Sequence, residues 1–509
     1  MISTVRPSLA PSTLDSTEAE AIVVGVAAGA NAPSLLDSPL TAETVSALES
    51  CLRPLGVTGR PDDVTRVPSP AGTDRTVVLT GIGSIDDGVT DEALRRAAGA
   101  AVRALSGLDH VALGLPAASA ETVQAIAEGA AMGAYTFTAH KSDADHAAET
   151  AQGQSRPIGR IDVLTDVADV EAAVHRAGVI ADAVCATRDL VNTPPSHLFP
   201  AAFAETAQQT LADTNVDVTV WDEQRLQAEG FGGIGAVGQG SSRPPRLVRL
   251  DHNPDGASAH VAIIGKGITF DTGGISLKPA TSMTTMKSDM AGAATVFAVV
   301  RAAAELGLPV RVTGWLAIAE NMPSHTAIRP SDVITMHGGK TVEVMNTDAE
   351  GRLVMADALV AATNETPDVV MDIATLTGAQ MIALGTRTTG VMGDAQLRDE
   401  IVAAADRVGE TAWAMPIPEN LRDSLDSRVA DLSNVGDRFG GMMTAAAFLR
   451  EFVDAGRDEA QRAQTPTPWA HIDIAGPSFN ESSAWGYTPQ DATGVMVRSL
   501  LGFIAGRAG

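Results

Sequence analysis

The chain has 509 residues, 45% of them hydrophobic, so it is long enough for about two to four domains and for a large buried core. Its 62 acidic residues outnumber 36 basic ones, and the net charge of −26 argues against general affinity for nucleic acids or anionic membranes. No stretch reaches the roughly 18 consecutive apolar residues of a membrane span. Two distant cysteines, Cys51 and Cys185, predict neither a disulfide framework nor a zinc ribbon, and a reducing cytoplasm suits them.

The N-terminal third of the chain reads as a tail followed by an α/β domain. Residues 1–20 are rich in Ser, Thr and Pro and lack the basic start and apolar core of a signal peptide, so we predict a mobile tail. Apolar strands then alternate with helical periodicity, which predicts an α/β domain over residues 1–170. The expected strands are 22–27, 76–80, 111–115 and 161–165, and the expected helices are 91–105 and 120–132.

A long helix is expected to link two domains. Apolar residues recur at helical spacing through this stretch, and we assign residues 171–191 to the linker helix. It must end near Pro194 and Pro195, because consecutive prolines do not continue a helix. Residues 192–509 then form the second, larger domain.

Strands of the second domain are nearly continuous apolar runs, which indicates a sheet buried on both faces. We therefore predict an α/β fold in which a central, mostly parallel sheet is covered by helices. The glycines of Gly230–Gly240 do not bridge a strand to a helix as a dinucleotide fingerprint requires, so we expect a turn-rich connection there. The expected strands are 216–221, 247–250, 261–265, 310–319, 333–336, 342–345, 369–373 and 469–476.

A polar, glycine-rich run, Lys266–Gly274, follows the expected strand 261–265, and polar residues continue through Lys278 to Asp289. A phosphate-binding P-loop is the obvious competing interpretation. It fails, because its first glycine would fall at His260 and its Ser or Thr at Gly267.

A second polar run, Asn346–Leu353, lies between the expected strand 342–345 and an apolar helix predicted over 353–362. If the run is extended, Asp348, Glu350 and Arg352 share one face, because alternate side chains of a strand point the same way. The carboxyl end of a strand is where open α/β sheets collect their sites.

Together the two runs supply four carboxylates and one amine: Lys266, Asp271, Asp289, Asp348 and Glu350. Such an excess of negative charge is too costly to bury without cations, and two divalent ions would balance it. Oxygen ligands with one amine suit Mg²⁺, Mn²⁺, Co²⁺ or Zn²⁺, and ligand type does not choose among them. A lysine ligand must be neutral, which requires a large fall in its pKa.

The run Asn346–Leu353 is similar to the signature of the leucyl aminopeptidases, also called cytosol aminopeptidases. The resemblance continues from about Arg188 to the end of the chain and is faint before about residue 170. It implies an enzyme that releases leucine and other amino-terminal residues from peptides with a free N-terminus. It also implies a homohexamer in the cytoplasm, with two divalent ions per subunit, manganese or zinc first and Mg²⁺ or Co²⁺ as alternatives.

The resemblance also assigns roles to individual residues. Lys278 is expected to stabilise the oxyanion, and Arg352 to hold a bicarbonate that carries the proton. Met286, Thr375 and Gly378 are expected to form the substrate pocket. His471 and Asp473 are expected to be structural, because no serine elbow accompanies them. The implied metal ligands are Lys266, Asp271, Asp289 and Glu350 for one ion, and Asp271, Asp348 and Glu350 for the other.

Two other functions compete with the peptidase. One is a DNA-binding regulatory role, which the net charge of −26 opposes. The other is binding of a nucleotide-like ligand by the N-terminal domain, which lacks a recognisable phosphate loop.

Overall fold

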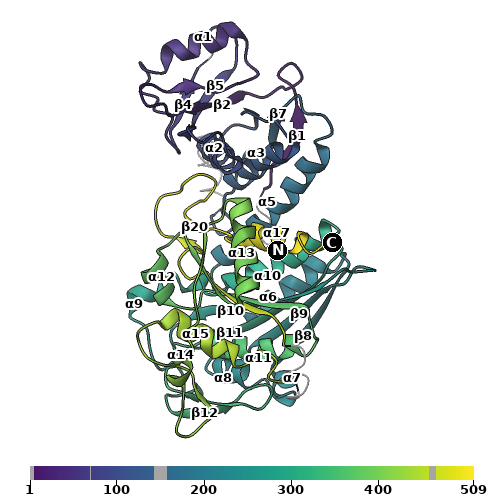
Figure 1. Ribbon diagram of the computed structural model, residues 1–509, viewed down its shortest axis with the longest axis vertical. Helices are drawn as coiled ribbons and strands as arrows, with labels where there is room; N and C mark the ends of the chain where they lie inside the picture. Colours follow the sequence, from purple (N-terminus) through teal and green to yellow (C-terminus); the bar gives the residue numbers. More distant parts are fainter. Residues whose placement is uncertain (1–4, 69, 143–156, 458–465, 509) are drawn as a thin grey trace. The chain divides into compact units, whose positions relative to one another are not determined.

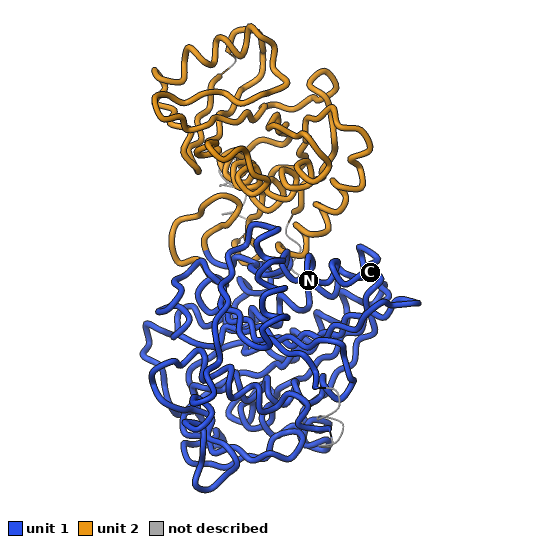
Figure 2. Tube along the Cα trace, viewed as in Figure 1, with its two compact units in different colours: residues 1, 186–479, 491–509 blue, residues 2–185, 480–490 orange. Residues whose placement is uncertain are grey.

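The computed structural model describes residues 5–68, 70–142, 157–457 and 466–508 (Figure 1). Its contacts divide the chain into two compact units (Figure 2). The N-terminal unit holds residues 2–185 and 480–490, and the C-terminal unit holds residues 186–479 and 491–509. The division falls inside helix α5 (Glu171–Asn192), the helix that stands where the linker helix was predicted.

The N-terminal unit is built on one sheet in the order β1-β7-β6-β2-β5-β4, with β3 paired to β2. Its pairs are parallel except for β3 with β2 and β4 with β5. The central strand β2 is buried along its whole length, as its apolar sequence predicts. The strands are β1 (Ser8–Ser12), β2 (Ala21–Ala27), β3 (Ser34–Leu35), β4 (Val64–Val67), β5 (Thr76–Gly83), β6 (His110–Gly114) and β7 (Arg160–Leu164), and the helices are α1 (Ala42–Cys51), α2 (Asp91–Ala104) and α3 (Ala120–Gly133).

The expected mobile tail was wrong for part of its length. Residues Ser8–Ser12 form β1, which pairs in parallel with β7. Nearby, Thr17 donates a 2.6 Å hydrogen bond to the buried carboxylate of Asp162. An edge strand is held by backbone hydrogen bonds, which need no apolar run, and this is why composition did not indicate it.

A short segment from near the C-terminus, residues 480–490, belongs to the N-terminal unit, whereas the sequence placed it with 192–509. Tyr487 packs directly on α2, because a Cβ at Gly99 would lie 2.5 Å from the Cβ of Tyr487. Its hydroxyl donates a 2.9 Å hydrogen bond to Glu92. These contacts join two stretches almost four hundred residues apart in the sequence.

The C-terminal unit is built on a larger sheet in the order β16-β15-β18-β14-β10-β11-β9-β8. The central pairs, β11 with β10, β10 with β14 and β14 with β18, are parallel, and antiparallel pairs lie toward the edges. The mostly parallel sheet predicted from the sequence is confirmed. Its strands are β8 (Val216–Trp221), β9 (Arg246–His252), β10 (His260–Asp271), β11 (Arg311–Asn321), β14 (Val369–Ala374), β15 (Thr389–Gly393), β16 (Ala412–Ala414) and β18 (Trp469–Asp473).

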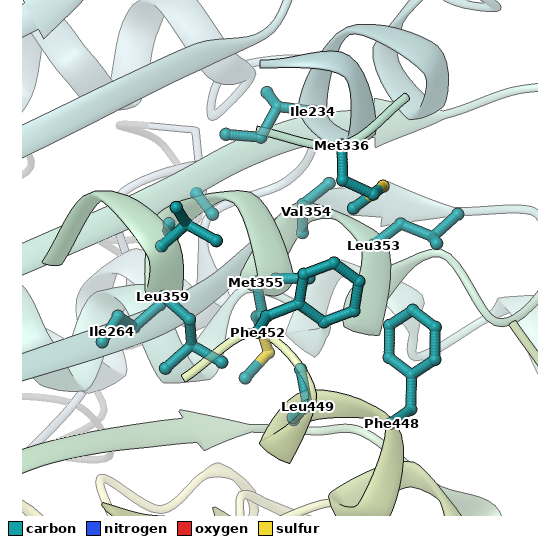
Figure 3. Close-up of a cluster of buried hydrophobic side chains, with 14 of the residues drawn as sticks. Ile234, Ile264, Met336, Leu353, Val354, Met355, Leu359, Phe448, Leu449 and Phe452 are labelled. Atoms are coloured by element: carbon teal, nitrogen blue, oxygen red, sulfur yellow. The ribbon is translucent and has the colours of Figure 1, made fainter. Parts of the chain in front are cut away.

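Helices cover both faces of this sheet. On one face a core cluster joins Ile264 of β10 with Leu353 and Leu359 of α11 (Gly351–Thr363) and Phe448 of α15 (Gly441–Arg450) (Figure 3). On the other face α10 (Ala291–Glu305) lies so close that a Cβ at Gly265 would meet its backbone at 2.5 Å. The remaining helices are α6 (Pro200–Leu211), α7 (Glu223–Ala228), α8 (Gly232–Gly238), α9 (Ala280–Met283), α12 (Gly378–Leu384), α13 (Ala395–Val408), α14 (Asn420–Asp423), α17 (Val497–Ala505) and the 3-10 turn η1 (Met286–Ser288).

The glycine-rich stretch after β8 is partly helical. Residues Gly232–Gly238 form α8, so the expectation of a turn-rich connection was wrong there. A Cβ at Gly233 would lie 2.5 Å from the carbonyl oxygen of Leu353, and this close approach to α11 explains that glycine. Small pairings complete the unit: β12 (Asp332–Thr335), β13 (Thr341–Val344) and β17 (Leu432–Ser433) form one sheet, and β19 (Phe479–Asn480) and β20 (Asp491–Ala492) another. Within the described part of the chain, no helix combines the length and apolar character needed to cross a membrane.

Candidate active site

The two polar runs meet at the carboxyl end of strand β10. Asp271 is the last residue of β10, and Asp348 and Glu350 lie in the turn between β13 and α11. Carboxylate oxygens of these three residues lie within 4.8 Å of one another. The fold therefore gathers carboxylates from two distant segments into one acidic cluster, as the sequence predicted.

Lys278 neutralises part of this cluster. Its Nζ lies 2.8 Å from Oδ2 of Asp271 and 2.5 Å from Oδ1 of Asp348. It stands in the loop after β10, and its backbone N–H is fixed by a 2.9 Å hydrogen bond to the carbonyl of Thr272. An ammonium group is thus held at the edge of the acidic cluster.

Lys266 and Asp289 form the deeper half of the site. Lys266 Nζ donates to Oδ1 of Asp289 at 2.8 Å and lies 2.9 Å from Oε1 of Glu350. Both residues are buried, Lys266 within β10 and Asp289 at the end of η1. All five predicted ligands therefore converge, although they come from three separate segments of the chain.

Burial and mutual repulsion perturb the carboxylates. Burial, with repulsion from neighbouring carboxylates, raises the pKa of Asp289 to about 8 and that of Asp271 to about 6. Burial also acts to raise the pKa of Glu350, but the attraction of Lys266 outweighs it and leaves that pKa below its usual range. For Lys266, burial acts to lower the pKa, and the carboxylates outweigh it and raise it. Four acids against two ammonium groups leave an excess of negative charge that additional cations would stabilise.

The run Asn346–Leu353 is not extended as predicted. Glu350 has helical backbone angles, and helix α11 begins at Gly351, two residues earlier than expected. Gly351 lets the buried Lys266 side chain pass close to the start of the helix, since a Cβ at position 351 would lie 2.5 Å from Cε of Lys266. The prediction of an extended backbone was therefore wrong, and Arg352 stands in the first turn of helix α11.

Arg352 is buried beside the cluster, with 8% of its surface exposed. One guanidinium nitrogen donates a 2.8 Å hydrogen bond to the backbone carbonyl of Asn434, and Nε is buried with no partner in the described part of the chain. Burial lowers the pKa of Arg352 to about 10, although Glu350 acts against this fall. Among the described residues, no carboxylate lies within ion-pair distance of this guanidinium.

The predicted pocket residues stand around the cluster in different ways. Thr375 follows strand β14, and its hydroxyl donates a 2.7 Å hydrogen bond to Asp289. Met286 opens η1, the turn that ends at Asp289. Gly378 is exposed at the start of α12, where a Cβ would meet no atom within 4 Å.

Two further side chains that position the site residues were not predicted from the sequence. Asn321, the last residue of β11, donates 2.8 Å and 3.1 Å hydrogen bonds to Asp271 and to the carbonyl of Thr347. Asn434 accepts from the backbone N–H of Met345 at 2.8 Å and so fixes the turn before Asp348. Asn321 could have been suspected as a polar residue ending an apolar strand, whereas nothing in the sequence marks Asn434.

His471 and Asp473 lie in strand β18, both fully buried. His471 pairs through Nδ1 with the carboxylate of Asp372 on the neighbouring strand β14. The oxygen atoms of Asp473 accept hydrogen bonds from the loop that follows β14. In the described part of the chain neither side chain is paired with a serine, and their structural role stays a prediction.

Comparison with known proteins identifies the family. Residues 185–501 match the model of the cytosol aminopeptidase family, catalytic domain, and residues 23–144 match that family's N-terminal domain. The chain is 65% identical over 513 residues to a probable cytosol aminopeptidase of Micrococcus luteus, with 100% of both chains covered. It is 48% identical over 500 residues to one from Streptomyces coelicolor, with 95% of each covered.

A solved structure adds a bound metal to the comparison. The bottromycin maturation enzyme BotP in complex with Mn has a TM-score of 0.83 at 36% identity, covering 96% of this chain and 100% of that chain. The acidic cluster described above is of the kind that holds such an ion. The chain therefore belongs to the cytosol aminopeptidase family, whose members are metal-dependent hydrolases that remove residues from the amino ends of peptides.

Proposed function

We propose that the chain is a leucyl aminopeptidase with two divalent cations, held by the five converging residues. The observation that carries this proposal is the charge of the cluster, four carboxylates against two lysines, one of which, Lys266, must give up its proton to bind a cation. In addition, Oε2 of Glu350 is buried and has no hydrogen-bond partner among the residues that the structure describes, as suits an oxygen that binds a cation. The ligands are Lys266, Asp271, Asp289 and Glu350 for one cation, and Asp271, Asp348 and Glu350 for the other.

Manganese or zinc is the proposed metal, with Mg²⁺ and Co²⁺ as alternatives. Carboxylate oxygens with one amine fit all four, and the bound Mn of the similar BotP structure favours manganese. When bound, such cations lower the pKa of water and polarise the peptide carbonyl.

Lys278 is proposed to stabilise the negative charge that develops on the scissile carbonyl oxygen. Its ammonium group already sits between Asp271 and Asp348, 2.8 Å and 2.5 Å away, at the edge of the cluster. Burial acts to lower the pKa of Lys278, but these carboxylates outweigh it and keep the group charged. A fixed charged donor of this kind is worth most where water is excluded.

Arg352 is proposed to hold bicarbonate, which would carry the proton from the attacking water to the departing amine. The guanidinium is buried, and among the described residues its Nε has no partner and its hydrogen bond goes to a backbone carbonyl. Its position in the first turn of α11 adds the favourable field of a helix N-terminus. A buried cation in this state favours a small planar anion that can accept two N–H bonds.

Peptides with a free N-terminus are the proposed substrates. The excess negative charge of the cluster attracts the cationic α-amine, and Met286, Thr375 and Gly378 are proposed to receive the side chain of the first residue. The half-buried Met286 is apolar, and Gly378 leaves open space, which suits leucine and residues of similar size.

A homohexamer in the cytoplasm is also proposed. Large apolar side chains stand exposed on the C-terminal unit, including Ile382 at 90% and Phe439 at 86%. Exposed apolar groups of this size favour burial against another chain. The cytoplasmic location is supported by the relatives in Micrococcus luteus and Streptomyces coelicolor, which are named probable cytosol aminopeptidases.

The decisive experiment removes the metal and restores each candidate ion separately. Chelation is expected to abolish cleavage of leucyl substrates, and Mn²⁺ or Zn²⁺ to restore it. Asp289→Asn and Glu350→Gln are expected to lose bound metal and turnover together, whereas Asp213→Asn, which changes an exposed acid, retains both. Full activity of Asp289→Asn after chelation and dialysis would contradict the ligand assignment.

A further inference from the structure

Asp473 ends strand β18, and its carboxylate is fully buried. Its Oδ1 accepts from the backbone N–H of Leu376 at 3.3 Å and of Ala475 at 3.1 Å, and its Oδ2 accepts from the hydroxyl of Thr377 at 2.8 Å. One carboxylate therefore binds donors from two loops, the one after β14 and the one after β18.

A second side chain joins the same two loops. Gln380 of α12 accepts a 2.7 Å hydrogen bond from Gly476, and its backbone N–H donates to the hydroxyl of Thr377 at 3.1 Å. Thr377 thus both caps the N-terminus of α12 and donates a hydrogen bond to Asp473. The start of α12, which includes Gly378, is anchored to the end of β18.

The other side of the loop faces the metal ligands. The carbonyl of Thr375 accepts a 3.1 Å hydrogen bond from Lys266, and its hydroxyl donates to Asp289 at 2.7 Å. Residues 375–377 therefore form a bridge, held at one end by the ligand cluster and at the other by Asp473.

We propose that Asp473 is a positioning residue that sets the distance between the wall of the substrate pocket and the metal ligands. This inference rests on the proposed pocket and ligand set. Asp473 is not one of the proposed metal ligands; it acts through Thr377 and Leu376 on the loop that carries Thr375 and Gly378. Loss of the anchor frees the pocket wall, so it weakens substrate binding and discrimination of the first residue more than it weakens metal binding.

The test compares variants of Asp473 and Thr377 in the full-length protein. Asp473→Asn keeps an oxygen for the two backbone donors but leaves the Thr377 hydroxyl hydrogen without its acceptor. Thr377→Val removes the hydroxyl alone, and Thr377→Ser keeps it. A hydrogen bond to a charged group is worth about 10-fold to 100-fold, so Asp473→Asn and Thr377→Val are expected to raise KM for a leucyl anilide by about 10-fold or more.

Two measurements distinguish a positioning role from a purely structural one: the preference for the first residue of the substrate and the affinity for metal. The kcat/KM ratio of leucyl to alanyl anilide is expected to fall in Asp473→Asn and Thr377→Val, while Thr377→Ser keeps the ratio and the KM of the wild type. Calorimetric titration with Mn²⁺ alone is expected to give affinities within about threefold of wild type, because these residues bind no metal.

Asp357→Asn is the matched control. Asp357 is equally buried and also accepts backbone N–H bonds, at 2.9 Å from Ile234 and 2.8 Å from His337, yet it holds α8 rather than the pocket loop. It is expected to lower the melting temperature and leave KM and preference unchanged.

Wild-type KM and preference in Asp473→Asn or in Thr377→Val would overturn the inference, as would an equal rise of KM in Asp357→Asn. If Asp473→Asn fails to fold, the comparison of Thr377→Val with Thr377→Ser tests the inference by itself. A failure of the proposed function is seen separately, in a wild-type protein that no divalent cation activates.

Discussion

Replacement of Arg352 by methionine separates the activity of this site from its stability. Methionine has a similar length and no charge. In the wild type, burial lowers the pKa of Arg352 from its ordinary value to about 10. At about 1.4 kcal/mol per unit of pKa, holding the charged guanidinium costs the folded protein roughly 3 kcal/mol.

The substitution also removes favourable contacts. The 2.8 Å hydrogen bond to the carbonyl of Asn434 is lost, at a cost of about 1 to 3 kcal/mol, and the guanidinium no longer lies near the ring of Phe448, 6.0 Å away. The free energy lost with these contacts nearly offsets the free energy gained when the buried charge is removed. We therefore expect the free energy of unfolding of Arg352→Met to equal that of the wild type or to exceed it by up to about 2 kcal/mol.

Activity is expected to change in the opposite sense. Turnover of a leucyl anilide should fall by about 10²-fold to 10⁴-fold, the usual worth of acid–base catalysis, with metal content unchanged. Wild-type turnover should also fall in bicarbonate-free buffer and recover when bicarbonate is added, and Arg352→Met should not respond.

The assays are urea unfolding, metal analysis and steady-state kinetics on the same preparations. Arg329→Met, at an exposed arginine paired with Asp332, is the control and should change neither stability nor turnover appreciably. A loss of 2 kcal/mol or more in Arg352→Met would refute the energetic reasoning, since it would mean that internal contacts satisfy the charge. Near-normal turnover together with indifference to bicarbonate would refute the proposed role.

Three further outcomes are expected. Lys278→Met should lower kcat by about 10²-fold to 10³-fold while metal content stays unchanged, and an equal loss of metal would contradict its role as a donor rather than a ligand. Burial acts to lower the pKa of His471, but the attraction of Asp372 outweighs it and raises that pKa. The ion pair of the two residues therefore stabilises the folded protein fully below about pH 6.5, and this stabilisation is lost as the pH rises through the folded-state pKa of His471. The stability gap between wild type and His471→Asn, measured by urea unfolding, should therefore be largest below about pH 6.5 and shrink as the pH rises through the folded-state pKa. Light scattering should give a hexamer, and a particle of 52.3 kDa would refute the proposed assembly.

Much of the active site could be predicted from the sequence because its chemistry is local. Apolar runs identify β10 and β14, and the residues directly after a parallel strand lie at the carboxyl edge of the sheet. Asp271 and Thr375 each stand at such a strand end, so pattern alone places both at this edge of the sheet. Carboxylates without enough lysine to balance them then point to cations, whatever the backbone between them does.

The family could be identified from the same residues, whereas the strands of the N-terminal unit were harder to predict. Its α/β class follows from alternating strands and helices, but β1 is an edge strand with little apolar character. The turn at Glu350 was misread for a different reason. The polar residues alternate as in a strand past β13, but the backbone is already helical at Glu350 and α11 begins at Gly351.

What only the tertiary structure decided is which distant segments become neighbours. Asp473 lies 96 residues beyond Thr377, and the two meet because β18 pairs with β14 across an intervening α/β segment. Likewise the segment 480–490 joins the N-terminal unit through Tyr487 and Glu92. Sequence patterns report periodicity within a segment, but the order of strands in a sheet is set by the packing of the whole core, so a contact between remote segments leaves no local signal.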